Sequence, residues 1–202
     1  MKTTMTVVLT LVAAALIGVG VVYSGRVGIG ADEPHSGLTA SLLGTARERA
    51  IARAAREVVV PGNLSDPKLI ASGAGEYAEM CTECHLAPAM KETELRAGLN
   101  PRPPDFSNAV PGTPAEQFWI VKHGIKMTGM PAWGLTHDDE RLWSMVAFLQ
   151  KLPGLSQSDY GALVGSGEGG HHHHEGSGEE SPDEESGEHS HEHADEPAVK
   201  SR

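Results

Sequence analysis

Cys81-Thr82-Glu83-Cys84-His85 is the stretch of sequence that decides the fold of this chain. It contains both cysteines of the 202-residue chain, separated by two residues, and a histidine directly follows the second cysteine. Two thiols at this spacing can add to the two vinyl groups of a haem, while the adjacent imidazole binds the iron on one side. The motif therefore predicts one covalent haem c, attached through Cys81 and Cys84 and ligated by His85.

Three other chemistries use paired cysteines, and each would need a feature that the sequence does not supply. A zinc ribbon needs a second pair of ligands, and a thioredoxin-like redox pair needs a βαβ setting. A structural disulfide would leave the histidine at the end of the motif unexplained. These three remain weaker alternatives to the haem.

A six-coordinate haem needs a second axial ligand, and we predict that Met130 supplies it. This residue lies in the segment Thr128-Gly129-Met130-Pro131, where glycine and proline prevent a regular helix and leave the thioether in a loop. Met127 is the nearest rival. His123 is a further one, and its ligation would give a haem of lower reduction potential.

The apolar periodicity predicts an all-α domain with long loops. We expect helices at residues 38–58, 67–80, 114–123 and 138–151, and no segment alternates as a strand would. A bound cofactor would have to support the longest loop, which carries Pro101, Pro103, Pro104 and Pro111. We divide the chain into an N-terminal anchor or signal at 1–24, a linker with an amphipathic helix at 25–66, a folded domain at 67–155 and a disordered tail at 156–202.

The N-terminal segment is an uncharged, mostly apolar run of nineteen residues from Met5 to Tyr23, preceded by Lys2. This length suits a membrane span, and no small-residue cleavage site follows closely, so we favour an uncleaved anchor over a cleaved export signal. The positive charge at Lys2 places the N-terminus in the cytoplasm and everything after Tyr23 outside it.

The predicted linker helix has arginines at positions 47, 49, 53 and 56. Such a helix can contact anionic lipid or an acidic partner, but a solvated helix face is the commoner explanation, and we prefer it here.

The tail accounts for most of the net charge of −11, because residues 165–202 contain eleven acidic and two basic residues. With almost no apolar side chains, this segment is predicted to be disordered. Its histidines, which can bind Zn, Cu or Ni without forming a defined site, are His171, His172, His173, His174, His189, His191 and His193. No cluster of lysine and arginine suits nucleic acid, so we exclude that class of partner.

Several further residues give the domain a family resemblance. Gly73, Tyr77 and Cys81 follow one another at intervals of four, Leu142, Trp143 and Phe148 lie in the last predicted helix, and Pro131 follows Met130. Over residues 67–155 the chain resembles a class I cytochrome c of the small, single-haem, membrane-anchored bacterial kind. The spacing from His85 to the prolines is longer than in the simplest members.

This resemblance implies the cytochrome c fold, with three to four helices around one haem. It implies that Gly73 lets the last helix cross closely, that an aromatic residue packs beside it, and that a proline carbonyl accepts a hydrogen bond from His85. It leaves open which proline does so. Arg102 is a candidate partner for a haem propionate. Trp119 and Trp133 either pack near the haem or fill the core.

Two filled axial positions would leave no open iron site, so the resemblance implies an electron carrier and not an enzyme. We expect it to pass single electrons between transient protein partners, a dehydrogenase or an oxidase, in a respiratory chain on the periplasmic side of a bacterial inner membrane. Two alternatives remain. One is a haem enzyme with an open site or the cytochrome subunit of a dehydrogenase, and the other is a metal-handling protein that acts through the histidine-rich tail.

Overall fold

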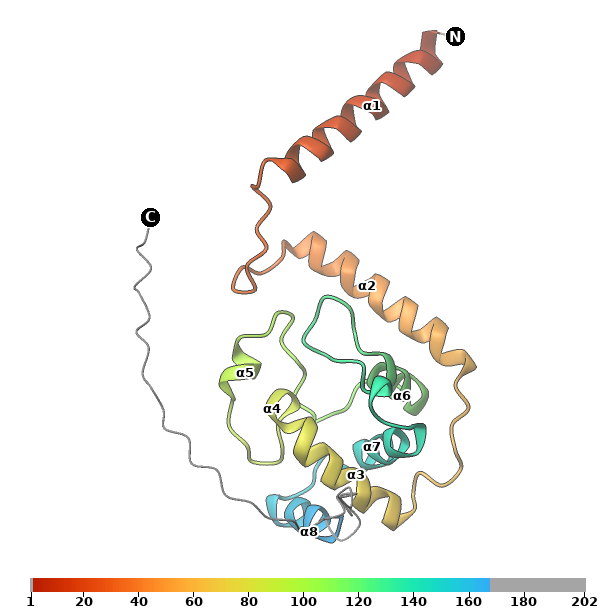
Figure 1. Ribbon diagram of the computed structural model, residues 1–202, viewed down its shortest axis with the longest axis vertical. Helices are drawn as coiled ribbons and strands as arrows, with labels where there is room; N and C mark the ends of the chain where they lie inside the picture. The colour runs from red at the N-terminus through yellow and green to blue at the C-terminus, as the bar shows by residue number, and fades with distance from the viewer. Residues whose placement is uncertain (1, 168–202) are drawn as a thin grey trace, which may run out of the picture. The chain divides into compact units, whose positions relative to one another are not determined.

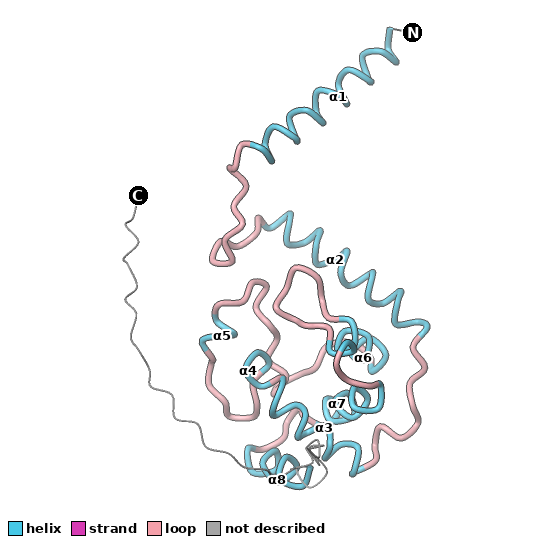
Figure 2. Tube along the Cα trace, viewed as in Figure 1, coloured by secondary structure: helices cyan, strands magenta, loops and turns pink. Residues whose placement is uncertain are grey.

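The fold is built from helices over residues 2–167, the part of the chain that the computed structural model describes (Figure 1). The α-helices are α1 (Lys2–Tyr23), α2 (Gly37–Ala54), α3 (Pro67–Met80), α4 (Thr82–His85), α5 (Glu94–Ala97), α6 (Pro114–His123), α7 (Asp139–Lys151) and α8 (Gln157–Gly167). Two 3-10 helices, η1 (Ala55–Glu57) and η2 (Trp133–Leu135), complete the set. No strand occurs in residues 2–167 (Figure 2), so the prediction of an all-α chain is confirmed.

The three main helices of the domain begin where their capping residues predict. The Asp66 side chain accepts a hydrogen bond from the N–H of Lys68 at the start of α3. At the start of α6, Thr113 and Glu116 form a reciprocal capping box. Helix α7 starts one residue later than predicted, because Asp138 caps it instead of belonging to it.

The predicted helix at 38–58 ends early. Helix α2 stops at Ala54, the tighter turn of η1 follows, and the backbone at Val58 is extended. The C-terminal part of this segment packs on α6 and buries Ile51 and Ala55. The α-helix therefore ends in the part of the segment that packs against α6, a contact that helix propensity does not predict.

The core forms where α3 and α7 cross. A Cβ atom on Gly73 would lie 1.9 Å from the backbone oxygen of Ser144, so only glycine lets the two helices approach this closely. Glu76, which is 1% exposed, accepts two hydrogen bonds from Arg141, from Nε at 2.8 Å and from a terminal nitrogen at 2.7 Å. The close crossing predicted for Gly73 is therefore present, and the ion pair beside it went unpredicted.

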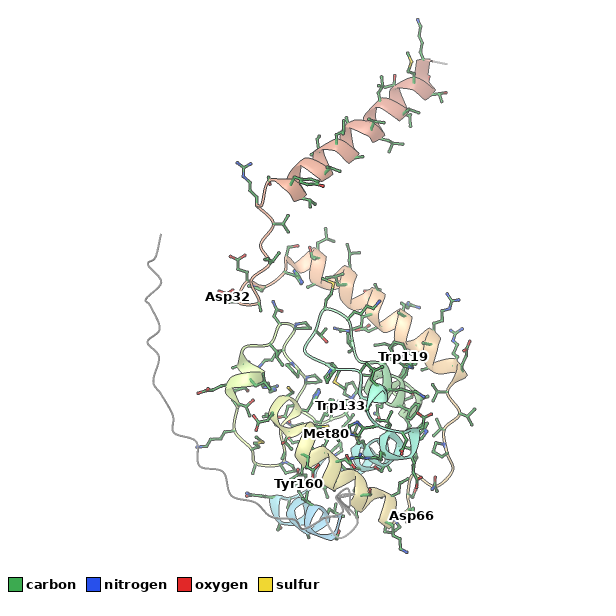
Figure 3. The ribbon with its side chains drawn as sticks, viewed as in Figure 1. Asp32, Asp66, Met80, Trp119, Trp133 and Tyr160 are labelled. Carbon is green, nitrogen blue, oxygen red and sulfur yellow. The ribbon has the colours of Figure 1, made fainter. Side chains whose placement is uncertain are left out.

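Helix α8 corrects the predicted extent of the disordered tail. We expected residues 156–202 to lack structure, but Gln157–Gly167 forms a helix against α3. Its Tyr160, labelled in Figure 3, packs on the cluster that contains Tyr77 and Phe148. We underestimated this segment because a few apolar side chains, Tyr160, Leu163 and Val164, suffice when they pack on the core of the domain. The rest of the predicted tail, including its histidines, lies outside the described residues.

Helix α1 contains the predicted apolar run and has no buried residue. The mean hydropathy of its most apolar window is 2.6, and among the described residues it is the one helix long and apolar enough to cross a membrane. An export signal near an N-terminus shares these properties. The composition of α1 thus agrees with either form of the N-terminal prediction.

Candidate haem-binding site

The cysteine motif lies where α3 ends and the single turn of α4 begins. Cys81 caps α3, and its carbonyl oxygen accepts hydrogen bonds from the N–H groups of Cys84 at 3.1 Å and His85 at 2.8 Å. Residues three and four apart share one side of a helical turn, so this turn directs the two thiols and the imidazole to the same side. The local helix thus supplies the grouping that attachment to one haem requires.

The two thiols are not joined in a disulfide. Burial raises the pKa of Cys81 to about 12, and burial also raises the pKa of Cys84 above its ordinary value. A thioredoxin-like pair works through a lowered thiol pKa, so these cysteines have the opposite character. No group of three His, Cys, Asp or Glu side chains that could hold a metal ion occurs in residues 2–167.

The segment after the prolines holds His85 in place. The Nδ1 atom lies 3.0 Å from the carbonyl oxygen of Pro104, which can only accept a hydrogen bond, so Nδ1 carries the proton. The ring stacks on Phe106 with centroids 4.0 Å apart, and the N–H of Phe106 donates to the His85 carbonyl. Burial lowers the pKa of His85, so the ring is neutral and Nε2 keeps its lone pair for a metal. The proline that the sequence left open is therefore Pro104.

Side-chain hydrogen bonds that the sequence did not predict stabilise the loop around His85. Asp105 accepts hydrogen bonds from the N–H of Ser107 at 2.9 Å and from its hydroxyl at 2.6 Å. Arg96 donates to the Pro103 carbonyl at 3.0 Å and to Glu92 at 2.5 Å. The Asp-Phe-Ser sequence after two prolines was an available signal for this turn. Nothing local in the sequence pointed to Arg96.

A buried nitrogen of Arg96 tests whether these residues fit a haem. Its Nε is buried and has no hydrogen-bond partner among the described residues, although the side chain is 10% exposed. A haem propionate is the kind of acceptor that such a donor lacks. Arg102, our candidate partner for a propionate, pairs with Glu92 at 2.6 Å and is largely exposed. The unsatisfied donor and the neutral imidazole both fit the predicted group.

The loop that carries Met130 is closed by its own hydrogen bonds. The N–H of Ile125 donates to the Met130 carbonyl at 3.2 Å. The Thr128 hydroxyl donates to Ile125 at 2.7 Å and accepts from the N–H of Met130 at 3.1 Å. Gly124 has a positive φ of 64°, and a Cβ atom there would lie 2.7 Å from the Met130 carbonyl oxygen. The loop can therefore turn back toward the domain only with glycine at its base.

The three candidates for the second axial ligand differ in their surroundings. Met130 is partly buried and packs on the cluster of α6 and α7 that contains Phe118 and Leu142. Met127 is 96% exposed. His123 is also exposed, and its ring lies against Trp119 at 4.9 Å. Of the three, Met130 alone packs on the core.

The proline-bearing loop and the Met130 loop meet. The side chain of Leu99 lies so close to Gly129 that a Cβ atom there would be 2.6 Å from it. The two loops that carry the Pro104 carbonyl and Met130 therefore come together on the same side of the domain. Trp133, near the centre of Figure 3, contacts the core cluster, and its ring meets His137 edge-on at 5.4 Å.

The comparison with protein families agrees with this geometry. A family model described as cytochrome C oxidase, cbb3-type, subunit III, matches residues 68–149, less than half of the chain. The match spans α3 to α7 and includes the cysteine motif and Met130. Residues 68–149 thus form a c-type cytochrome domain with the cytochrome c fold, and a domain of this kind suggests haem-based electron transfer. No curated protein matches the chain.

Proposed function

We propose that this chain carries a single haem c and passes one electron at a time between redox proteins outside the cytoplasm. The observation that carries the proposal is the fixed state of His85, whose Nδ1–H is held by Pro104 while burial keeps the ring neutral. A neutral imidazole with a fixed orientation and a free Nε2 lone pair is suited to bind iron, whereas a structural disulfide would not need it. When bound, the haem supplies an iron that accepts and releases one electron.

Each part of the site has a separate task in this proposal. Cys81 and Cys84 hold the group covalently, and the hydrogen bond to Pro104 raises the basicity of His85 as a ligand. Met130 would supply a thioether ligand, which would favour the reduced state and raise the reduction potential. The buried Nε of Arg96 would be available to donate to a propionate. Because the chain would supply both protein ligands, little rearrangement would accompany electron transfer.

The setting we propose is the periplasmic face of a bacterial inner membrane. Helix α1 serves as the anchor, and its hydropathy supports this. The matching family model is named for a subunit of a cytochrome c oxidase, which supports a place on a path toward a terminal oxidase. Tethering would raise the effective concentration of the domain near membrane complexes.

The test is to express the chain together with haem-attachment machinery and to record absorption spectra of the oxidised and reduced protein. A spectrum of the denatured protein with pyridine identifies the haem linkage. We expect one c-type haem per chain, a low-spin reduced spectrum and a far-red sulfur-to-iron band. Met130→Ala should lose that band, and Met127→Ala, the matched control in the same loop, should keep it. Loss of the band only in Met127→Ala would show that Met127, and not Met130, is the sulfur ligand.

Two other outcomes would favour the alternatives. A high-spin spectrum with ready binding of carbon monoxide would indicate an open iron site and the enzymatic function. Absence of covalent haem would overturn the proposal altogether.

A further inference from the structure

Helix α2 presents a stripe of side chains that the cytochrome domain does not use. Its buried residue Ile51 faces α6, and α2 lies against α6 in Figure 1. At about 100° per residue, Leu38, Leu42, Arg49 and Arg53 fall within an arc of about 60°, roughly opposite Ile51. We call these four residues the α2 stripe.

The α2 stripe is exposed along its whole length. Leu38 is 72% exposed and Leu42 is 62% exposed, so two large apolar side chains face outward near the start of the helix. Arg49 and Arg53 are exposed as well, and within the described residues neither forms an ion pair. The single acidic residue of α2, Glu48, lies on the flank of the helix at about 110° from the centre of the stripe.

Leucines followed by unpaired arginines on one face suit the interface of a lipid bilayer. Apolar side chains enter the boundary between headgroups and acyl chains, and guanidinium groups bind lipid phosphates. Only residues 24–36 separate α1 from α2, so the start of α2 stays within about 50 Å of the end of α1 even when that connection is fully extended. The leucines lie at the end of α2 that this connection reaches first.

We propose that α2 docks through its stripe on the anionic surface of the membrane that α1 spans, which rests on the anchoring role proposed for α1. A lipid surface is favoured over an acidic protein because a short connection joins the leucines and arginines of the α2 stripe to the proposed membrane anchor α1. Since α2 packs on α6, which leads into the Met130 loop, docking fixes how the haem domain is turned relative to the membrane. The sequence alone favoured a merely solvated helix face.

The experiment is hydrogen–deuterium exchange of the full chain in lipid nanodiscs, followed by mass spectrometry of peptides from α2. We expect slower exchange over residues 37–53 in discs containing phosphatidylglycerol than in discs of phosphatidylcholine alone. Arg49→Gln with Arg53→Gln should weaken docking by roughly 25-fold, since each arginine near an anionic surface contributes roughly fivefold. Leu38→Ser with Leu42→Ser should abolish the slow exchange.

Arg47→Gln is the matched control on the same helix, because Arg47 points away from the stripe and lies 4.0 Å from Glu48. It should leave the slow exchange unchanged. Equal exchange in both disc compositions would overturn the proposal, as would an equal loss in Arg47→Gln. Stripe variants that keep normal exchange but slow electron transfer to an acidic protein would overturn it in favour of a protein-docking surface.

Elution of the chain with the discs reports on the anchor separately. If the chain fails to elute with the discs, the anchoring role of α1 fails and the inference falls with it. If the chain elutes with them but α2 exchanges at the same rate on both lipids, the anchor stands and only the docking of α2 is wrong.

Discussion

The crossing of α3 and α7 and the two loops of the haem site are held together in different ways. At the crossing, Leu142, Met145 and Phe148 are at most 1% exposed, and the backbones touch at Gly73. The loops have few buried apolar side chains and depend on single hydrogen bonds, such as those of Pro104 and Thr128. Changes at the crossing should therefore lower the stability of the whole domain, and changes in the loops should alter iron ligation with a smaller loss of stability.

Arg141→Met should have the largest effect on stability, about 4 kcal/mol, because it leaves the buried Glu76 carboxylate without its guanidinium partner. Thermal unfolding followed by circular dichroism would measure it. Arg102→Met is the control, since it breaks an exposed pair with Glu92 on the loop and should change the stability little. Equal losses in the two variants would remove the distinction between the crossing and the loops.

Gly73→Ala should cost about 3 kcal/mol, because the added methyl group meets the backbone of α7 and neither helix can yield locally. Gly161→Ala in α8 is the control. Nothing lies within 4 Å of a Cβ atom there, so alanine should be neutral or stabilising. Denaturant unfolding of both variants would measure the difference, and a neutral Gly73→Ala would show that the helices do not approach this closely.

Tyr77→Phe tests a hydrogen bond that connects the helix crossing to the loop after His85. The Tyr77 hydroxyl, on α3, donates to the carbonyl of Leu86, the residue after His85, at 2.6 Å. Leu86 has a positive φ of 62°, which a leucine rarely adopts and which this bond helps to hold. We expect a loss of about 1–2 kcal/mol in chemical denaturation.

The control for this bond is Tyr160→Phe. The Tyr160 hydroxyl has no hydrogen-bond partner among the described residues, so its removal should be neutral or stabilising. A larger loss in Tyr160→Phe than in Tyr77→Phe would contradict the role given to the Leu86 bond.

Thr128→Val should have the smallest effect on unfolding, about 1 kcal/mol, because it removes the two hydrogen bonds that close the Met130 loop. Its effect on ligation should be clearer. Added imidazole should displace the methionine roughly fivefold more readily, measured by loss of the far-red band. Thr136→Val, which removes an exposed hydroxyl, should not change imidazole binding. A fall in stability with unchanged imidazole affinity would show that Thr128 acts on the stability of the domain, as residues of the helix crossing do, and not on ligation.

Much of the fold was predictable because its signals are local. The predicted ranges 67–80 and 114–123 match α3 and α6 to the residue, and the close crossing at Gly73 followed from the resemblance. Helix α8 and the early end of α2 were missed, since both depend on surfaces that other helices provide. A weakly apolar segment becomes a helix when a groove accepts its few side chains.

The sequence by itself determined that two thiols and an imidazole fall within one helical turn, because this depends on spacing alone. Only the tertiary structure decided which proline holds His85, that Arg96 has a buried donor without a partner among the described residues, and which candidate ligand packs on the core. These features join residues that are far apart in the chain. They arise from how loops fold back on one another, and neither spacing nor residue type records that.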